Sequence, residues 1–210
     1  MAPVAGRPFI EHLMDHWISQ GVGRFFLSVG HMAHVIQDRL GPAYGGCPIE
    51  YVVEAEPLGT GGALLLAAQR LKAGSPFLVL NGDTYCDVDL QAAWKRHQDF
   101  EASLSMILAP HPGTPRFESI ECDGLGRVLS LRPRGSGAGG RINAGVYLFD
   151  STAVLDGEGL RSCSLEQDLL PTWLSAGLKI GGVPHNGYFI DIGLPEDYAA
   201  ANGRFLAKGE

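Results

Sequence analysis

Apolar runs and amphipathic stretches alternate through the first hundred residues of the chain. A helical spacing of apolar positions predicts helices over residues 9–17, 31–40, 60–71 and 90–100. Short runs rich in Val, Ile, Leu and Phe predict strands over residues 24–29, 48–54 and 76–80. Strands that alternate with helices are typical of βαβ units, so this half indicates an α/β fold with a largely parallel sheet.

The pattern changes after residue 100, where short strands follow one another closely. We expect strands over residues 102–108, 119–122, 127–131 and 141–149, separated by Pro and Gly turns. Two helices follow, over residues 165–175 and 195–206. Pro195 lies in the first turn of the second one, where the missing N–H of a proline costs no hydrogen bond. The second half is therefore predicted to be mixed and partly antiparallel, without an internal repeat or an interdomain linker.

Length and charge restrict the functional class. A chain of 210 residues can bury one large core without disulfides. A net charge of −7 argues against binding to a nucleic-acid polymer or to an anionic membrane. No apolar stretch has the length of a membrane span, and the start MAPVAGRPF lacks the apolar core of a signal peptide, so we expect a cytoplasmic protein.

The four cysteines are scattered, at positions 47, 86, 122 and 163, without a C-x-x-C pair. This spacing gives no zinc site and no disulfide framework. We expect reduced and mostly buried thiols.

Asn81, Gly82 and Asp83 follow the apolar strand PFLVL, at the end where open α/β sheets bind their ligands. A carboxylate in this position can hold a metal ion, although Asn-Gly-Asp is also an ordinary turn.

A second acidic residue, Asp191, interrupts the apolar run FIDIG just before the helix predicted from Pro195. It is a candidate cap for that helix or a metal ligand. Two aspartates at strand ends favour a shared cation. Mg²⁺ suits them, because it prefers oxygen ligands and joins one or two carboxylates to substrate phosphates.

A glycine-rich loop, Leu58-Gly59-Thr60-Gly61-Gly62, joins a strand to a helix. Such a loop can present backbone N–H groups to an anion or a base, but it can equally be a plain turn. It lacks the Gly-Lys-Ser/Thr ending of a Walker loop and the third glycine of a dinucleotide-binding loop.

The stretch from Arg127 to Arg141 contains four arginines and no acid. It can meet phosphate, or it can form a solvated loop.

Six ordered segments, taken together, resemble the sugar-phosphate nucleotidyltransferase family. They are PVAGRPFIEHL, EAEPLGTGGAL, FLVLNGDTYCDVDL, INAGVYLFD, SLEQDLLP and FIDIGLPEDY, and they span nearly the whole chain. The similarity is greatest to the D-glycero-D-manno-heptose 1-phosphate guanylyltransferases, with the mannose-1-phosphate guanylyltransferases next. It implies a single domain over residues 1–210 with a Rossmann-like nucleotidyltransferase fold, a mixed but mostly parallel sheet flanked by helices.

The resemblance also implies roles for individual residues. Asp83 and Asp191 match the two magnesium ligands of the family. The positions that match its nucleotide side are Glu54, Gly59, Thr60, Asn81 and Gly82. The positions that match its sugar side are Asn143, Gly145 and Glu166.

The chemistry of Glu54 supports guanine as the base. An ionised carboxylate only accepts hydrogen bonds, and guanine offers two adjacent donors on its pairing edge. Uracil or thymine would pair better with an amide side chain.

The chain departs from the family pattern in two places. The family opens with a strand, a glycine-rich triphosphate loop ending in Thr-Arg, and a lysine, and the 210 residues do not contain them. We therefore expect a domain shortened at its N-terminus, with its first strand absent. The family usually has Glu-Lys where this chain has Pro133 and Arg134, so Arg134 is expected to supply the charge for the sugar phosphate.

The implied reaction transfers GMP from GTP to a sugar 1-phosphate, releases pyrophosphate and forms an NDP-sugar, a lipopolysaccharide or capsule precursor. The sugar is expected to be D-glycero-D-manno-heptose or mannose. No protein nucleophile is needed, because Mg²⁺ and positioning supply the rate. The alternative is a nucleotide- or sugar-binding regulatory subunit without the triphosphate loop. A homo-oligomer is possible, and the sequence does not decide it.

Overall fold

The computed structural model describes residues 1–110, 118–132 and 140–207. Its largest sheet, among these residues, has the strand order β10-β9-β11-β8-β12, with β6 paired to the other part of β11. These strands are β6 (Phe77–Leu80), β8 (Leu104–Pro110), β9 (Ser119–Cys122), β10 (Val128–Arg132), β11 (Arg141–Phe149) and β12 (Ile180–Pro184). The apolar runs of β8 and β11 lie in its centre and are almost completely buried, as strands covered on both faces require.

Smaller sheets surround it in the described ranges. One contains β3 (Phe25–Val29), β5 (Cys47–Val53) and β4 (Ala43–Tyr44), in this order. The others pair β7 (Thr84–Cys86) with β13 (Phe189–Asp191), and β1 (Pro3–Val4) with β2 (Arg7–Pro8). The mixed α/β class is therefore confirmed. Parallel pairing among the described strands is limited to β3 with β5 and β8 with β12, so the sheets are less parallel than the sequence pattern predicts.

The predicted helices are present. They are α1 (Phe9–Ser19), α2 (Ala33–Leu40), α3 (Gly59–Ala68), α4 (Leu90–Asp99), α5 (Leu170–Ser175) and α6 (Pro195–Ala207). The helix expected over residues 165–175 begins instead as a π-turn, η2 (Leu165–Leu169), in which the Leu169 N–H reaches the carbonyl of Ser164. A 3₁₀ turn, η1 (Thr152–Leu155), precedes it. None of the helices in the described part is long and apolar enough to span a membrane.

The strand β12 was not predicted, because its sequence IGGVP resembles a turn. In the structure its glycines lie against neighbouring segments, and a Cβ atom on Gly181 would clash with Ser105 Oγ. On Gly182 it would come within 2.7 Å of a Leu108 methyl carbon. Close approach to β8 therefore explains why two glycines form a strand here.

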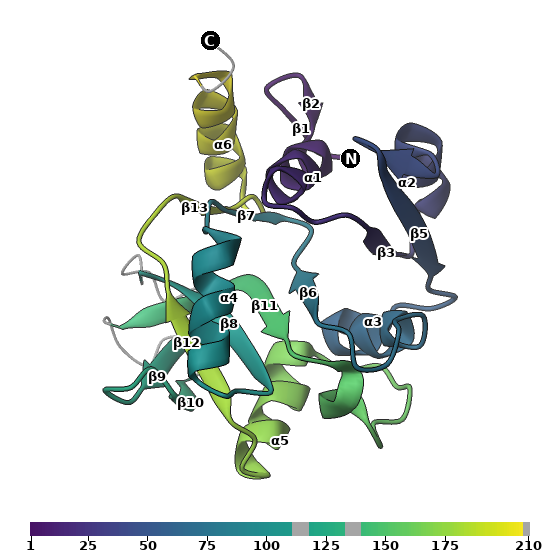
Figure 1. Cartoon of the computed structure of the whole chain (residues 1–210). Coiled ribbons are helices and arrows are strands. Elements are labelled where there is room, and N and C mark those ends of the chain that lie inside the picture. The colour runs from purple at the N-terminus through teal and green to yellow at the C-terminus, as the bar shows by residue number, and fades with distance from the viewer. Residues whose placement is uncertain (111–117, 133–139, 208–210) are drawn as a thin grey trace.

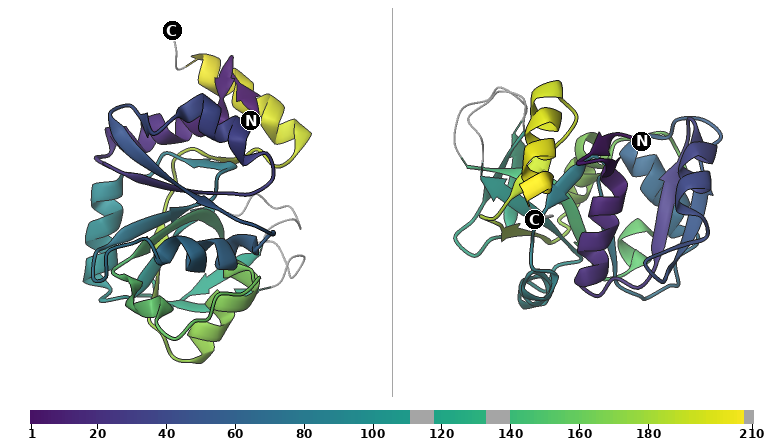
Figure 2. Two further views of the ribbon diagram at one scale, coloured as in Figure 1. Left: turned by 90° about the vertical axis from the view of Figure 1, so that its right-hand side faces the viewer. Right: turned by 90° about the horizontal axis from the view of Figure 1, so that it is seen from above.

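The first and last helices pack together at one end of the molecule (Figures 1 and 2). The rings of Phe9 and Phe205 meet edge to face with their centroids 6.1 Å apart. The side chain of Asn202 accepts a hydrogen bond from the Ala5 N–H at 2.9 Å. Segments from the two ends of the sequence thus share one small core.

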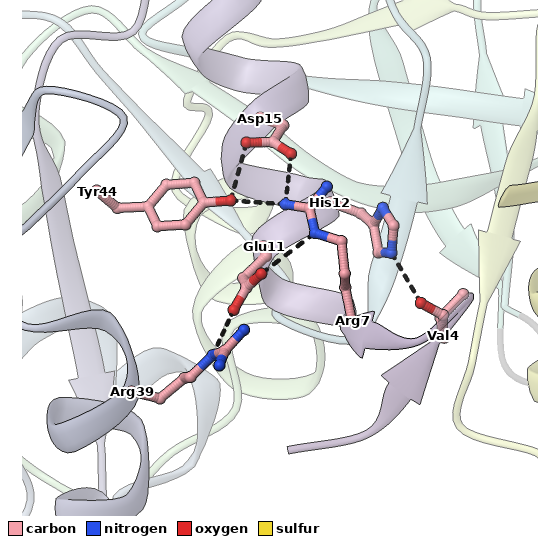
Figure 3. A network of polar contacts seen from close by, with 7 residues as sticks. All are labelled: Val4, Arg7, Glu11, His12, Asp15, Arg39 and Tyr44. Carbon is pink, nitrogen blue, oxygen red and sulfur yellow. Dashed lines mark hydrogen bonds and ion pairs between the residues drawn. The ribbon is translucent and has the colours of Figure 1, made fainter. Parts of the chain in front are cut away.

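A polar network joins α1 to β2, α2 and β4 (Figure 3). We call it the Glu11 network, and its members are Arg7, Glu11, Asp15, Arg39 and Tyr44. The Glu11 side chain is only 7% exposed, and it accepts from Arg39 Nε at 2.7 Å and from Arg7 Nε at 3.3 Å. Arg7 also reaches Asp15 and Tyr44, each at 2.7 Å. The hydrogen bond from Arg39 holds the pKa of Glu11 below its ordinary value.

Candidate active site

A cavity of about 1700 Å³ opens between β3 and β6. Every residue of these two strands lines it, together with apolar side chains of α1 and α3. Among the described strands, β3 pairs only with β5, and β6 only with β11. Each therefore turns one edge without a strand neighbour toward the cavity.

The predicted nucleotide-side residues meet at this cavity. They line it where β5 and β6 end and α3 begins, and they are Glu54, Gly59, Thr60, Asn81 and Gly82, followed by Asp83. The carboxyl ends of β5 and β6 thus share one edge, as expected for ligand binding in an open α/β sheet.

The described lining is rich in acids. It contains Glu54, Asp83, Asp87 and Asp89, and Arg24 is its one basic side chain. A phosphate group that enters would meet carboxylates unless a cation or backbone N–H groups lay between them.

Asp83 and Asp191 belong to neighbouring chain segments. The Ile192 N–H donates to the Asp83 carbonyl at 2.9 Å, and Asp191 lies opposite Thr84 in the β13–β7 pair. Asp83 is exposed in the turn before β7, and Asp191 is half-buried. One oxygen of Asp191 accepts from the Gly193 N–H at 2.7 Å, so this carboxylate shapes the turn before α6.

Glu54 is held at the end of β5 by two donors. The Ser28 hydroxyl donates to Oε1 at 2.9 Å, and the Leu58 N–H donates to Oε2 at 3.0 Å. A carboxylate has about four acceptor positions, so both oxygens keep room for further donors. Glu54 also lines the cavity.

The glycine loop packs tightly against the chain around Cys163. The N–H groups of Gly61 and Gly62 both donate to the Cys163 carbonyl, at 2.9 and 3.2 Å. Gly59 has a φ of +72°, and a Cβ atom there would come within 2.6 Å of that same oxygen. These two N–H groups serve the fold, which explains the glycines by close packing rather than by anion binding.

Gly145 links the sugar-side positions to the cavity edge. It has a φ of +66° at an irregularity in β11, and a Cβ atom would come within 2.8 Å of the Asn81 side chain. The Asn81 N–H donates to the Gly145 carbonyl at 2.8 Å. The Gly145 N–H donates to Asn143 Oδ1 at 3.0 Å, so Asn81 and Asn143 are tied through one glycine.

Glu166 lies in a network of neutral donors on the π-turn. We call this the Glu166 network, and its members are Thr60, Asn143, Tyr147, Ser164 and Glu166. Oε2 accepts from the hydroxyls of Thr60 at 2.7 Å and Ser164 at 3.1 Å, and Oε1 accepts from the Tyr147 hydroxyl at 2.7 Å. Asn143 donates through Nδ2 to the Tyr147 oxygen. Burial raises the pKa of Tyr147 well above its ordinary value, and this keeps the hydroxyl protonated as a donor.

Sequence reasoning missed two side chains that hold the predicted ones, Ser28 at Glu54 and Tyr147 at Glu166. Tyr147 carried a signal, because a hydroxyl inside the apolar run AGVYLF must find a partner when it is buried. Ser28 carried none.

Arg134 lies outside the described residues. Of the nearby arginines, Arg132 pairs with Glu121 at 2.8 Å. Arg141 donates to the carbonyls of Leu108 and His185, each at 3.0 Å. Both are thus engaged within the protein.

Comparisons with known proteins agree on one family. A family model described as nucleotidyl transferase matches residues 1–208. D-glycero-alpha-D-manno-heptose 1-phosphate guanylyltransferase of Aneurinibacillus thermoaerophilus is 35% identical over 202 residues, which cover 96% of this chain and 86% of the relative. The protein of the same name from Campylobacter jejuni is 31% identical, and the match covers 94% of this chain and 86% of that relative. The crystal structure of HddC from Yersinia pseudotuberculosis complexed with GMP-PN superposes with a TM-score of 0.85 at 32% identity, over 98% of this chain and 88% of that one.

Proposed function

We propose a reaction from one premise: this chain belongs to the nucleotidyl transferase family. It is a sugar-1-phosphate nucleotidyltransferase that transfers GMP from GTP, releases pyrophosphate and forms a GDP-sugar. D-glycero-D-manno-heptose 1-phosphate is the first candidate acceptor and mannose 1-phosphate the second, which the names of the relatives support.

The juxtaposition of Asp83 and Asp191 carries this proposal. A backbone hydrogen bond of 2.9 Å joins their segments beside the cavity that the nucleotide-side residues line. Two carboxylates from adjacent segments next to such a cavity suit a cation that also binds phosphate oxygens.

The residues present fit magnesium. Among the residues that the structure describes, no group of three or more His, Cys, Asp or Glu side chains could hold a metal ion. A pair of aspartates suits an ion that keeps several positions for water and substrate phosphates. We assign Asp83 and Asp191 as its ligands, and the bound ion would neutralise charge on the reacting phosphates.

The protein's own residues bind and orient the two substrates. Glu54 accepts the two adjacent donors of guanine, supported by its place in the cavity lining and by the Ser28 and Leu58 donors that fix its carboxylate. Asn143, Gly145 and Glu166 hold the sugar. With both substrates in place, an oxygen of the sugar phosphate attacks the α-phosphorus of GTP and the bond to pyrophosphate breaks. No side chain needs to act as a nucleophile.

We also propose that the enzyme works in the cytoplasm. Its four cysteines are all free thiols, as expected in a reducing compartment.

Pyrophosphate release tests the reaction directly. The purified protein is assayed with GTP, ATP, CTP, UTP and dTTP against a panel of sugar 1-phosphates that includes both candidates. We expect turnover with GTP and one of the two candidate sugar 1-phosphates. Turnover with UTP or dTTP but not GTP would contradict the role of Glu54, and no release with any pair would contradict the reaction.

The variant Asp191→Asn tests the metal assignment. It removes a ligand charge and keeps the shape, so magnesium-dependent turnover should fall by at least about 100-fold, since the bound ion contributes several kcal/mol. Circular dichroism should show an unchanged fold. Asp38→Asn, at an exposed aspartate of α2 outside the cavity lining, is the matched control and should keep normal turnover. An Asp191→Asn enzyme with normal magnesium dependence would refute the assignment.

A further inference from the structure

Tyr147 is a fully buried tyrosine whose hydroxyl ends in the sugar side of the candidate site. Its backbone lies in the middle of β11, opposite Val79 of β6 and Met106 of β8. Its ring belongs to the core cluster that also contains Leu64 and Leu165. The ring needs only an apolar environment, so the hydroxyl is the part that calls for a specific explanation.

The hydroxyl uses its hydrogen and a lone pair on two different side chains. It donates to Glu166 Oε1 at 2.7 Å, because an ionised carboxylate can only accept. It accepts from Asn143 Nδ2. The second polar atom of each partner is also hydrogen-bonded. Asn143 Oδ1 accepts from the Gly145 N–H, and Glu166 Oε2 accepts from the hydroxyls of Thr60 and Ser164.

These contacts remove rotational freedom from both sugar-side groups. With one end held, a carboxylate or an amide can still turn about its last bond. With the Tyr147 hydroxyl between them, Asn143 and Glu166 have a single mutual orientation. Groups that must meet the hydroxyls of a substrate gain affinity when they are fixed in this way before binding.

We propose that Tyr147 is a positioning residue for the sugar 1-phosphate: its hydroxyl fixes the Glu166 carboxylate and the Asn143 amide in the orientation that binds the sugar hydroxyls. This inference rests on the proposed function. It concerns the acceptor, because the two side chains that the hydroxyl contacts, Glu166 and Asn143, are the sugar-side residues of that proposed function.

The test is the variant Tyr147→Phe, which removes one oxygen and keeps the ring. We expect the KM for the sugar 1-phosphate to rise about tenfold, since a side chain that is no longer fixed in advance must be ordered on binding, which costs up to about tenfold in affinity. The KM for GTP should stay within about twofold of wild type. The matched control is Tyr51→Phe, whose hydroxyl donates to the Gly41 carbonyl at 2.6 Å in another sheet. It should leave both KM values unchanged.

A role limited to stability would lower the melting temperature without separating the two KM values. Equal changes in the KM values for the sugar 1-phosphate and for GTP, or no change in either value, would overturn the proposal. If the wild-type protein turns over no sugar 1-phosphate, the proposed function fails, and the positioning role fails with it. Turnover by wild type with the same sugar KM in Tyr147→Phe refutes the positioning role alone.

If Tyr147→Phe does not fold, a measurement on the wild-type protein tests the proposal instead. The side-chain amide signal of Asn143, identified by its loss in Asn143→Ser, should exchange its hydrogens slowly and should shift on addition of sugar 1-phosphate. Fast exchange without ligand, or a shift with GTP alone, would contradict the proposal.

Discussion

The Glu11 network and the Glu166 network are each built around one glutamate, but their donors differ. Glu11 accepts from two arginines, Arg7 and Arg39, so its charge is balanced inside the network. Glu166 accepts from three hydroxyls, and in the described part of the chain it forms no ion pair. Hydroxyl donors fix a carboxylate without cancelling its charge. The comparison suggests that the first network holds α1 in place, whereas the second keeps an anionic acceptor ready for a ligand.

The largest effect expected from a change in either network is on catalysis, from Glu166→Ala. In the proposed site this carboxylate accepts from the sugar hydroxyls, so its loss should lower kcat/KM for the sugar 1-phosphate about 100-fold, as for other groups that hydrogen-bond a substrate. Steady-state kinetics measure it. The free energy of unfolding should also fall, by about 1–3 kcal/mol, because the buried Tyr147 hydroxyl loses this acceptor. A Glu166→Ala protein that loses stability but keeps its kinetics would make the two networks equivalent and break the comparison.

Glu11→Ala should change the stability of the protein without changing its kinetics. The change removes charged hydrogen bonds from a side chain that is only 7% exposed, so urea denaturation should show a loss of about 2 kcal/mol in the free energy of unfolding. The kinetic constants should stay near wild type. The control is Glu50→Ala, since Glu50 also pairs with two arginines but is 33% exposed and should contribute less than about 1 kcal/mol.

The smallest expected effect is a difference between the two networks in how their contribution to stability depends on pH. The pKa of Glu11 is lowered by Arg39, so its contribution to stability is present above its ordinary pKa and is lost as the pH falls below it. The pKa of Tyr147 is raised by burial, so its contribution is present below its ordinary pKa and is lost as the pH rises through 10. Burial also raises the pKa of Cys86 to about 12, which adds a loss that begins near pH 9.

Melting temperatures across the pH range provide the measurement. Glu11→Gln should flatten the acid side of the curve, and Tyr147→Phe should flatten the alkaline side above pH 10. The slope involved is at most about 1.4 kcal/mol per pH unit for each group. Either variant acting on the opposite side would contradict this assignment.

Local pattern was sufficient for most of the fold. The helix α1 could be predicted because Phe9, Leu13, Met14 and Trp17 recur on one face, and all four are buried. The strand β12 could not, because its glycines are explained by atoms of β8, a distant segment. The sequence pattern placed Asp83 and Asp191 at strand ends, and the structure joins their segments; their role as metal ligands stays a prediction. It could not reveal the Thr60–Glu166 bond, which joins residues 106 positions apart.

The unshared edges of β3 and β6 have a consequence for hydrogen exchange. In a strand that is paired along one side only, alternate N–H groups point to the open side. Amides of β3 and β6 should therefore alternate between slow and fast exchange with solvent, one residue to the next. Those of β8, which is paired on both sides, should be protected throughout. Among the described strands of these two sheets, the amides that exchange first should thus lie along the walls of the cavity, while those of β8 should exchange last.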